Sequence, residues 1–174
     1  MAGRRDEILS GQNRLLTPTE LAVDEEGRLT FYMENQGVYV WSTLAEGEDP
    51  PVSGMFEEIP PTWTEEDMSL SEFLVEVCLF EAILSAQFGA AAGCASQTTL
   101  DRLRPELPLL PLAPWRWPNY PSQFFAREGA FAFVAPYEHR GEVAFSIWIG
   151  AKTSRPLSFL EGMVGDPEWE HVAL

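Results

Sequence analysis

Residues whose types and spacing could support catalysis are few in this chain of 174 residues. The two histidines, His139 and His171, belong to no metal-ligand pattern such as HExxH, and the P-loop, GxGxxG and GxSxG motifs are all absent. The thiol of Cys78 lies between Glu76 and Glu81, whereas a thiolate nucleophile requires an electropositive setting. We therefore expect no catalytic cysteine, no bound metal and no organic cofactor.

Carboxylates are the abundant reactive groups, with 27 Asp and Glu against 11 Lys and Arg, and a formal net charge of −16. Two carboxylates at a suitable distance can hydrolyse a glycosidic bond, so a small hydrolase is one interpretation. The other is an anionic surface that keeps the protein in solution or steers cationic partners. A concave pocket holding two carboxylates of raised pKa would favour the hydrolase, and a convex acidic patch would favour binding.

The negative charge is concentrated in one part of the chain. No Lys or Arg occurs between Arg28 and Arg102, an interval of 73 residues that contains thirteen Asp or Glu. Such asymmetry is typical of a protein with a charged partner, and an anionic surface repels nucleic acid and acidic membranes. We therefore predict a basic protein partner. The predicted contact residues lie in the acidic connection at 43–67 and after it: Glu46, Glu48, Asp49, Glu57, Glu58, Glu65, Glu66 and Asp67.

The composition indicates one globular domain, because 45% of the residues are hydrophobic and 12% aromatic. The most apolar stretch, Val77–Ala95, is interrupted by Glu81 and Gln87, so we predict no transmembrane helix. The two cysteines form no CxxC pair, which favours a reducing cytoplasm. We expect Cys78 to act as a small hydrophobic residue on an apolar helix.

Two β-rich runs, Leu29–Met33 and Val38–Ser42, flank the turn residues Glu34–Gly37 and predict an antiparallel hairpin. Residues 43–67 read as a long loop with one short strand at Val52–Phe56.

A helix is predicted from Ser69, because Ser69 and Glu72 form a capping box ahead of an apolar repeat. Its inward face is Phe73, Val77, Phe80, Leu84 and Phe88, with Glu72 and Glu76 pointing elsewhere.

The remainder of the chain predicts a second group of strands. Gly89 should end the helix, and the small residues that follow it to Ser96 read as a loop or a weak helical extension. Six prolines within Pro105–Pro121, interleaved with Leu and Trp, predict an extended strap over the core. Three β-like runs at 123–126, 130–135 and 143–149 predict a meander, and a short helix should follow at 155–160.

One segment carries a more specific signal than composition. The run FYMENQGVYVW at residues 31–41, followed by Asp49-Pro-Pro-Val, resembles the core signature of the SUKH superfamily, the Smi/Knr-like proteins that include many bacterial immunity proteins. The resemblance is strong over residues 11–52 and looser after residue 98. It implies an α+β fold with an antiparallel β-sheet and flanking helices over 1–174 as a single domain. From this comparison we expect the opening helix of the family to be missing or trimmed in this sequence.

The resemblance further implies binding rather than catalysis, because family members commonly neutralise toxins, many of them nucleases. Our first hypothesis is accordingly a cytoplasmic, non-enzymatic immunity-type protein that binds a cationic toxin domain. A carboxylate-dependent hydrolase and a scaffold without a toxin partner are the alternatives. We interpret the motif residues as structural, with a hairpin whose side chains satisfy backbone groups: Glu34, Asn35, Gln36, Gly37 and Trp41.

Overall fold

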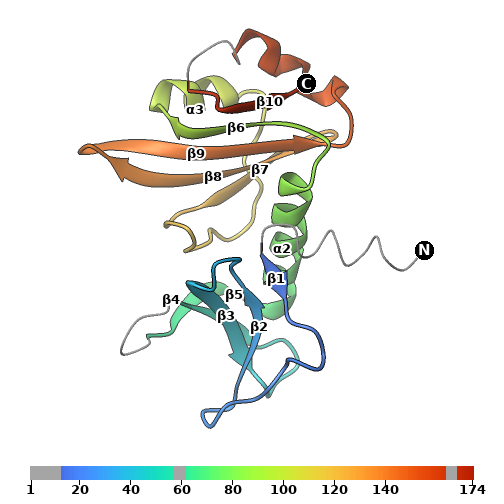
Figure 1. Cartoon of the computed structure of the whole chain (residues 1–174), viewed down its shortest axis with the longest axis vertical. Coiled ribbons are helices and arrows are strands. Elements are labelled where there is room, and N and C mark those ends of the chain that lie inside the picture. The colour runs from blue at the N-terminus through green and yellow to red at the C-terminus, as the bar shows by residue number, and fades with distance from the viewer. Residues whose placement is uncertain (1–12, 57–61, 164–167) are drawn as a thin grey trace. The chain divides into compact units, whose positions relative to one another are not determined.

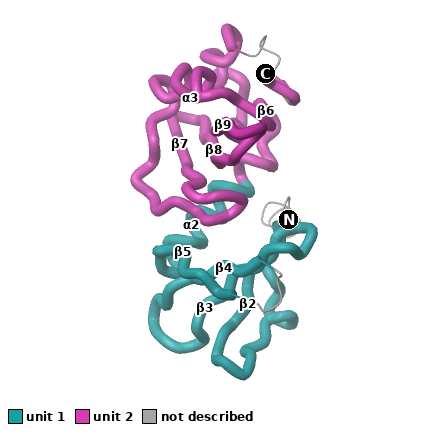
Figure 2. Tube along the Cα trace, turned by 90° about the vertical axis from the view of Figure 1, so that its left-hand side faces the viewer, with its two compact units in different colours: residues 1–81 teal, residues 82–174 magenta. Residues whose placement is uncertain are grey.

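The computed structural model describes residues 13–56, 62–163 and 168–174. The chain divides into two compact units, Met1–Glu81 and Ala82–Leu174, which are coloured separately in Figure 2 and described separately below. Both units combine an antiparallel sheet with helical segments, which confirms the α+β class. The expectation of a single domain stays a prediction.

The sheet of the first unit is an antiparallel meander in which all five strands pair in chain order (Figure 1). The predicted hairpin is present as the second and third strands, with Tyr32 opposite Trp41, and the predicted strand at 52–56 is present as the fourth. The fifth strand falls where the sequence predicted a loop. The strands are β1 (Arg14–Leu15), β2 (Arg28–Met33), β3 (Tyr39–Leu44), β4 (Pro51–Phe56) and β5 (Thr64–Ser69).

Helix α2 (Leu70–Leu84) follows β5 directly, and its capping box forms as predicted. The Ser69 amide donates to the Glu72 carboxylate at 2.9 Å, and the Glu72 amide donates back to the Ser69 hydroxyl at 3.5 Å. The predicted inward residues Phe73, Val77 and Phe80 are at most 2% exposed.

The rest of the predicted helix pattern is wrong in three places. The helix ends at Leu84, ahead of the predicted stop at Gly89. Glu76, which we expected to point away from the core, is buried. Cys78, which we expected to pack as a hydrophobic residue, is exposed. The helix is apolar on more than one side, so its hydrophobic pattern does not fix which side faces the core.

The sheet of the second unit has the order β10-β6-β9-β8-β7 and is antiparallel throughout. The predicted meander is confirmed as β7 (Gln123–Arg127), β8 (Ala130–His139) and β9 (Glu142–Ala151). The small-residue run read as a loop or helix is instead strand β6 (Phe88–Ala95). Strand β10 (His171–Ala173) pairs with it.

The interior of the second unit is largely apolar. Helix α3 (Gln97–Leu103) and the 3-10 helix η1 (Arg155–Gly162) contribute Leu100, Leu103, Leu157 and Leu160 to one buried cluster with residues of the sheet. A second group of aromatic rings joins Trp115 to Phe124 and Phe133, with centroids 4.9–5.8 Å apart.

The proline-rich segment is the predicted strap. Trp115 is fully buried, and Leu109 bridges Phe125 on β7. None of the helices within the described residues is long and apolar enough to cross a membrane.

Candidate functional site

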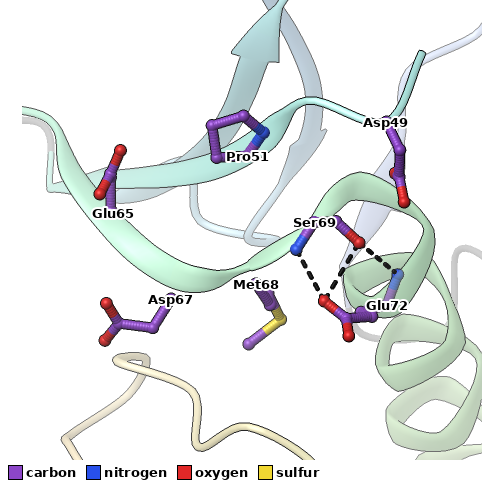
Figure 3. Close-up of a pocket in the computed structure, with 7 residues that line it drawn as sticks. All are labelled: Asp49, Pro51, Glu65, Asp67, Met68, Ser69 and Glu72. Atoms are coloured by element: carbon purple, nitrogen blue, oxygen red, sulfur yellow. Dashed lines mark hydrogen bonds between the residues drawn. The ribbon is translucent and has the colours of Figure 1, made fainter. Parts of the chain in front are cut away.

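The first unit has an acidic pocket of about 390 Å³ beside the start of α2 (Figure 3). Three structural elements contribute to it: the segment that enters β4, strand β5 and the first turn of α2. Four of the seven lining residues carry carboxylates. The lining residues are Asp49, Pro51, Glu65, Asp67, Met68, Ser69 and Glu72.

Side chains along strand β5 alternate between the interior of the unit and the pocket side. Glu66 and Met68 face inward and are 0% and 5% exposed, whereas Glu65 and Asp67 are exposed. Asp67 has a φ of +57°, a left-handed conformation that Asp tolerates better than most residues. The pairing of β4 with β5 is irregular between Pro51 and Ser53. An irregular strand therefore presents two carboxylates outward while holding a third inside the unit.

Two of the pocket carboxylates are already bound to the helix start. Asp49 accepts hydrogen bonds from the Ser71 amide at 2.8 Å and the Ser71 hydroxyl at 2.7 Å. These bonds lower the pKa of Asp49 below its ordinary value of 3.8. Glu72 accepts from Ser69 in the capping box. Asp49 and Glu72 therefore act as acceptors for amides at the start of the helix.

This geometry meets only part of the criterion for a hydrolase. The site is concave and acidic, as a carboxylate-dependent enzyme requires. The pKa of Asp49, however, shifts downward, whereas a general acid needs a raised pKa. Within the residues that the structure describes, no three His, Cys, Asp or Glu side chains are grouped so that they could hold a metal ion.

The predicted partner residues fall into four groups. Glu46 and Glu48 are exposed in the connection between β3 and β4, and Asp49, Glu65 and Asp67 line the pocket. Glu57 and Glu58 lie outside the described residues. Glu66 is fully buried, so its assignment as a partner contact is wrong.

The Glu66 carboxylate belongs to the interior of the first unit. It accepts hydrogen bonds from the Tyr39 hydroxyl at 3.2 Å and from the Trp41 indole at 3.0 Å. Gly54 leaves the space for this arrangement, because a Cβ there would lie 2.6 Å from the Glu66 oxygen and 2.1 Å from the Tyr39 hydroxyl. The alternation of Glu66 with Met68 was the sequence signal that could have placed this carboxylate inside.

A second buried carboxylate, Glu81, was given no role in the sequence analysis and lies at the C-terminal end of the first unit. Glu81 accepts hydrogen bonds from the Tyr32 hydroxyl at 2.8 Å and from the Asn13 amide at 3.1 Å. Burial and the negative charge of Glu81 raise the pKa of Tyr32 above its ordinary value of 10. Glu81 on α2 thereby binds both β2 and the residue immediately before β1 through one carboxylate. The sequence signal for this buried carboxylate was the position of Glu81 in an otherwise apolar helical stretch.

The turn between β2 and β3, at residues 34–37, is held by the side chain of its first residue. The Glu34 carboxylate accepts from the Gln36 amide at 2.8 Å and the Val38 amide at 3.4 Å. Gly37 has a φ of +75°, which a glycine adopts without strain. Asn35 and Gln36 are exposed, and Trp41 is fully buried in the next strand. These contacts match the structural role expected for Glu34, Gly37 and Trp41.

A larger cleft of about 720 Å³ lies in the second unit and has a different electrostatic character. Its lining includes Arg127 and Arg155 as well as Glu106 and Glu128, so its formal charges balance. Arg127 is held by an ion pair with Glu106 at 2.8 Å. The cleft of the second unit is therefore not a second acidic site.

Comparison with known proteins adds no assignment: no family model, no curated protein and no solved structure matches this chain.

Proposed function

We propose that this protein is a non-catalytic binding module of the immunity type, which neutralises a basic protein by covering its cationic surface. The observation that carries the proposal is the division of charge between the two units. Residues 1–81 contain four Lys or Arg and 18 Asp or Glu, a formal charge of −14. Residues 82–174 contain seven and nine, a formal charge of −2.

The exposed carboxylates of the predicted partner residues that the structure describes lie in the β3–β4 connection and around the pocket. Glu46 and Glu48 extend from the β3–β4 connection, and Asp49, Glu65 and Asp67 lie around the pocket. An anionic surface of this kind accelerates encounter with a cationic protein and disfavours acidic competitors. The partner that we propose is therefore a basic protein surface rather than nucleic acid or an acidic membrane.

A nuclease toxin is the specific partner class that we propose. Nuclease active sites are cationic because they bind phosphate, so an anionic protein can occlude them. The resemblance of residues 31–52 to the SUKH signature supports the same class, because members of that superfamily commonly neutralise such toxins. We place the neutralising protein in the cytoplasm, where an incoming nuclease would act.

A hydrolase is retained as a second candidate because the pocket is concave and holds four carboxylates. The two candidates differ in a simple activity measurement. A hydrolase predicts cleavage of aryl glycosides by the purified protein and loss of cleavage in Glu65→Gln. The binding module predicts no turnover in either protein.

The experiment that tests the proposal compares two charge-reversal variants in capture from extracts of the source cells. The test variant is Glu46→Lys with Glu48→Lys. The control is Glu138→Lys with Glu142→Lys, which makes the same change in net charge on exposed residues of the second unit. We expect the wild type and the control to retain a basic partner that the test variant loses.

The captured partner is then purified and assayed alone for nuclease activity. Inhibition by the wild-type protein at equal concentration would support the immunity role. A captured protein whose activity is unchanged by binding would support the scaffold alternative. Equal capture by both variants would contradict the acidic surface as the binding site.

A further inference from the structure

The edges of the two sheets are closed in different ways. Strand β5, the last strand of its sheet in the described residues, carries the exposed charges of Glu65 and Asp67 and a left-handed residue at Asp67. Charges and backbone irregularity both hinder pairing with another chain. Strand β7 is covered by the strap, where the Ala126 amide donates to the Pro108 carbonyl at 2.9 Å.

Strand β6 has no charged side chain of its own, and the irregularity in its pairing with β9 lies between Ala92 and Ala95, beyond the residues that pair with β10. Its sequence, FGAAAGCA, contains no charged residue and no proline. Small uncharged side chains allow a second strand to approach closely along the regular part of this edge, Gly89–Ala91. Without a covering strand, β6 would therefore be the edge of the second unit that pairs most readily with another chain.

The segment Glu168–Leu174, here called the covering segment, closes this edge. Its strand β10 pairs with β6, with His171 opposite Ala91 and Ala173 opposite Gly89. The Glu170 amide also donates to the Ala91 carbonyl at 2.9 Å.

Two side chains anchor the covering segment ahead of the strand. Trp169 is 8% exposed within the apolar cluster, and Glu168 accepts from the Ser96 amide at the start of α3 at 3.3 Å. The anchor and the paired strand are therefore separate parts of one segment.

We propose that β10 is a guard strand whose role is to prevent the β6 edge from pairing with a second copy of this chain. The second copy is the fitting occupant because an antiparallel β6–β6 pair is self-complementary about a twofold axis. The low formal charge of the second unit, −2, opposes such an approach far less than the −14 of the first. The proposal is independent of the toxin partner.

The test deletes residues 171–174 and leaves Trp169 and Glu168 in place. Light scattering coupled to size exclusion measures the mass of the full and shortened chains as concentration rises. We expect the mass of the shortened chain to rise toward twice that of the full chain, because one new edge allows one new pairing. We also expect the amides within Gly89–Ala91 that point toward β10 to exchange faster in the dilute shortened chain, whereas those that point toward β9 keep their partners.

A third protein identifies the surface through which the shortened chain associates. Adding Ala91→Lys to the deletion places a charge on the exposed edge and should return the mass to that of the full chain. If the shortened chain does not fold, Val172→Pro with Ala173→Pro in the full chain removes the pairing amides instead. A folded variant of constant mass, or association that Ala91→Lys leaves intact, would overturn the proposal.

Discussion

The two units of this protein differ in whether they bury carboxylates. The first unit buries the carboxylates of Glu34, Glu66, Glu76 and Glu81, and it has a formal charge of −14. The second unit has a buried cluster of Ala, Leu, Ile, Val, Phe and Trp and is nearly neutral. Part of the negative charge counted in the sequence is therefore structural, and only the exposed remainder of it can act on a partner.

The largest effect should come from cutting the apolar core of the first unit. Phe80→Ala removes a ring that is 2% exposed on α2 and should lower the free energy of unfolding by about 3–5 kcal/mol. Denaturant unfolding measures this loss. Phe133→Ala removes a fully buried ring from the second unit and is the matched comparison. An unchanged midpoint in Phe80→Ala would show that α2 does not pack as described.

The next effect tests whether buried carboxylates hold the first unit together. Glu66→Ala leaves the Tyr39 hydroxyl and the Trp41 indole without their shared acceptor. The expected loss of unfolding free energy is about 2–4 kcal/mol, because two buried donors lose a partner. Glu66→Gln keeps an acceptor oxygen and should lose less. Equal losses in the two variants would mean that these hydrogen bonds contribute little.

In the second unit, close packing should be the vulnerable feature. A Cβ at Gly150 would lie 2.6 Å from the Ile83 carbonyl, which is backbone and cannot rotate away. We expect Gly150→Ala to cost about 1–3 kcal/mol of unfolding free energy. Gly162→Ala is the control, because a Cβ there meets no atom within 4 Å. Similar thermal stability in both variants would contradict the tight approach.

The smallest effect concerns the acidic site itself and depends on pH. The folded-state pKa of Asp49 is depressed, chiefly by the hydrogen bond from the Ser71 side chain. Its stabilisation is therefore present above pH 3.8 and is lost as the pH falls through the folded-state value. We expect Asp49→Asn to lower the Tm at neutral pH by an amount that shrinks in acid. A difference in Tm independent of pH would rule out this linkage.

Local signals in the sequence predicted the parts of the fold that depend on neighbouring residues. The capping box at Ser69 and the hairpin around Gly37 are examples, because their hydrogen bonds join residues within a few positions. Strands β5 and β6 were missed for the opposite reason. Acidic and small residues have low β-propensity, and pairing with β4 and β9 decides their conformation.

The sequence predicted that the candidate site is acidic, but it did not predict which of the acidic residues are buried. The acidic character of residues 43–67 and the exposure of Glu46 and Glu48 could be anticipated from charge alone. The burial of Glu66 depends on Tyr39, Trp41 and the space left by Gly54, which come from other strands. Only the folded sheet brings these residues together.

The measurement that tests the acidic surface most directly is the association rate with the captured basic partner, followed as salt concentration rises. Screening shortens the reach of exposed charges to about 8 Å at physiological ionic strength, so we expect association to slow steeply. Glu46→Lys with Glu48→Lys should slow association at low salt and flatten the salt dependence. The control, Glu138→Lys with Glu142→Lys, should keep the steep dependence. A salt-independent rate, or equal slowing in both variants, would contradict the assignment of partner binding to the acidic surface of the first unit.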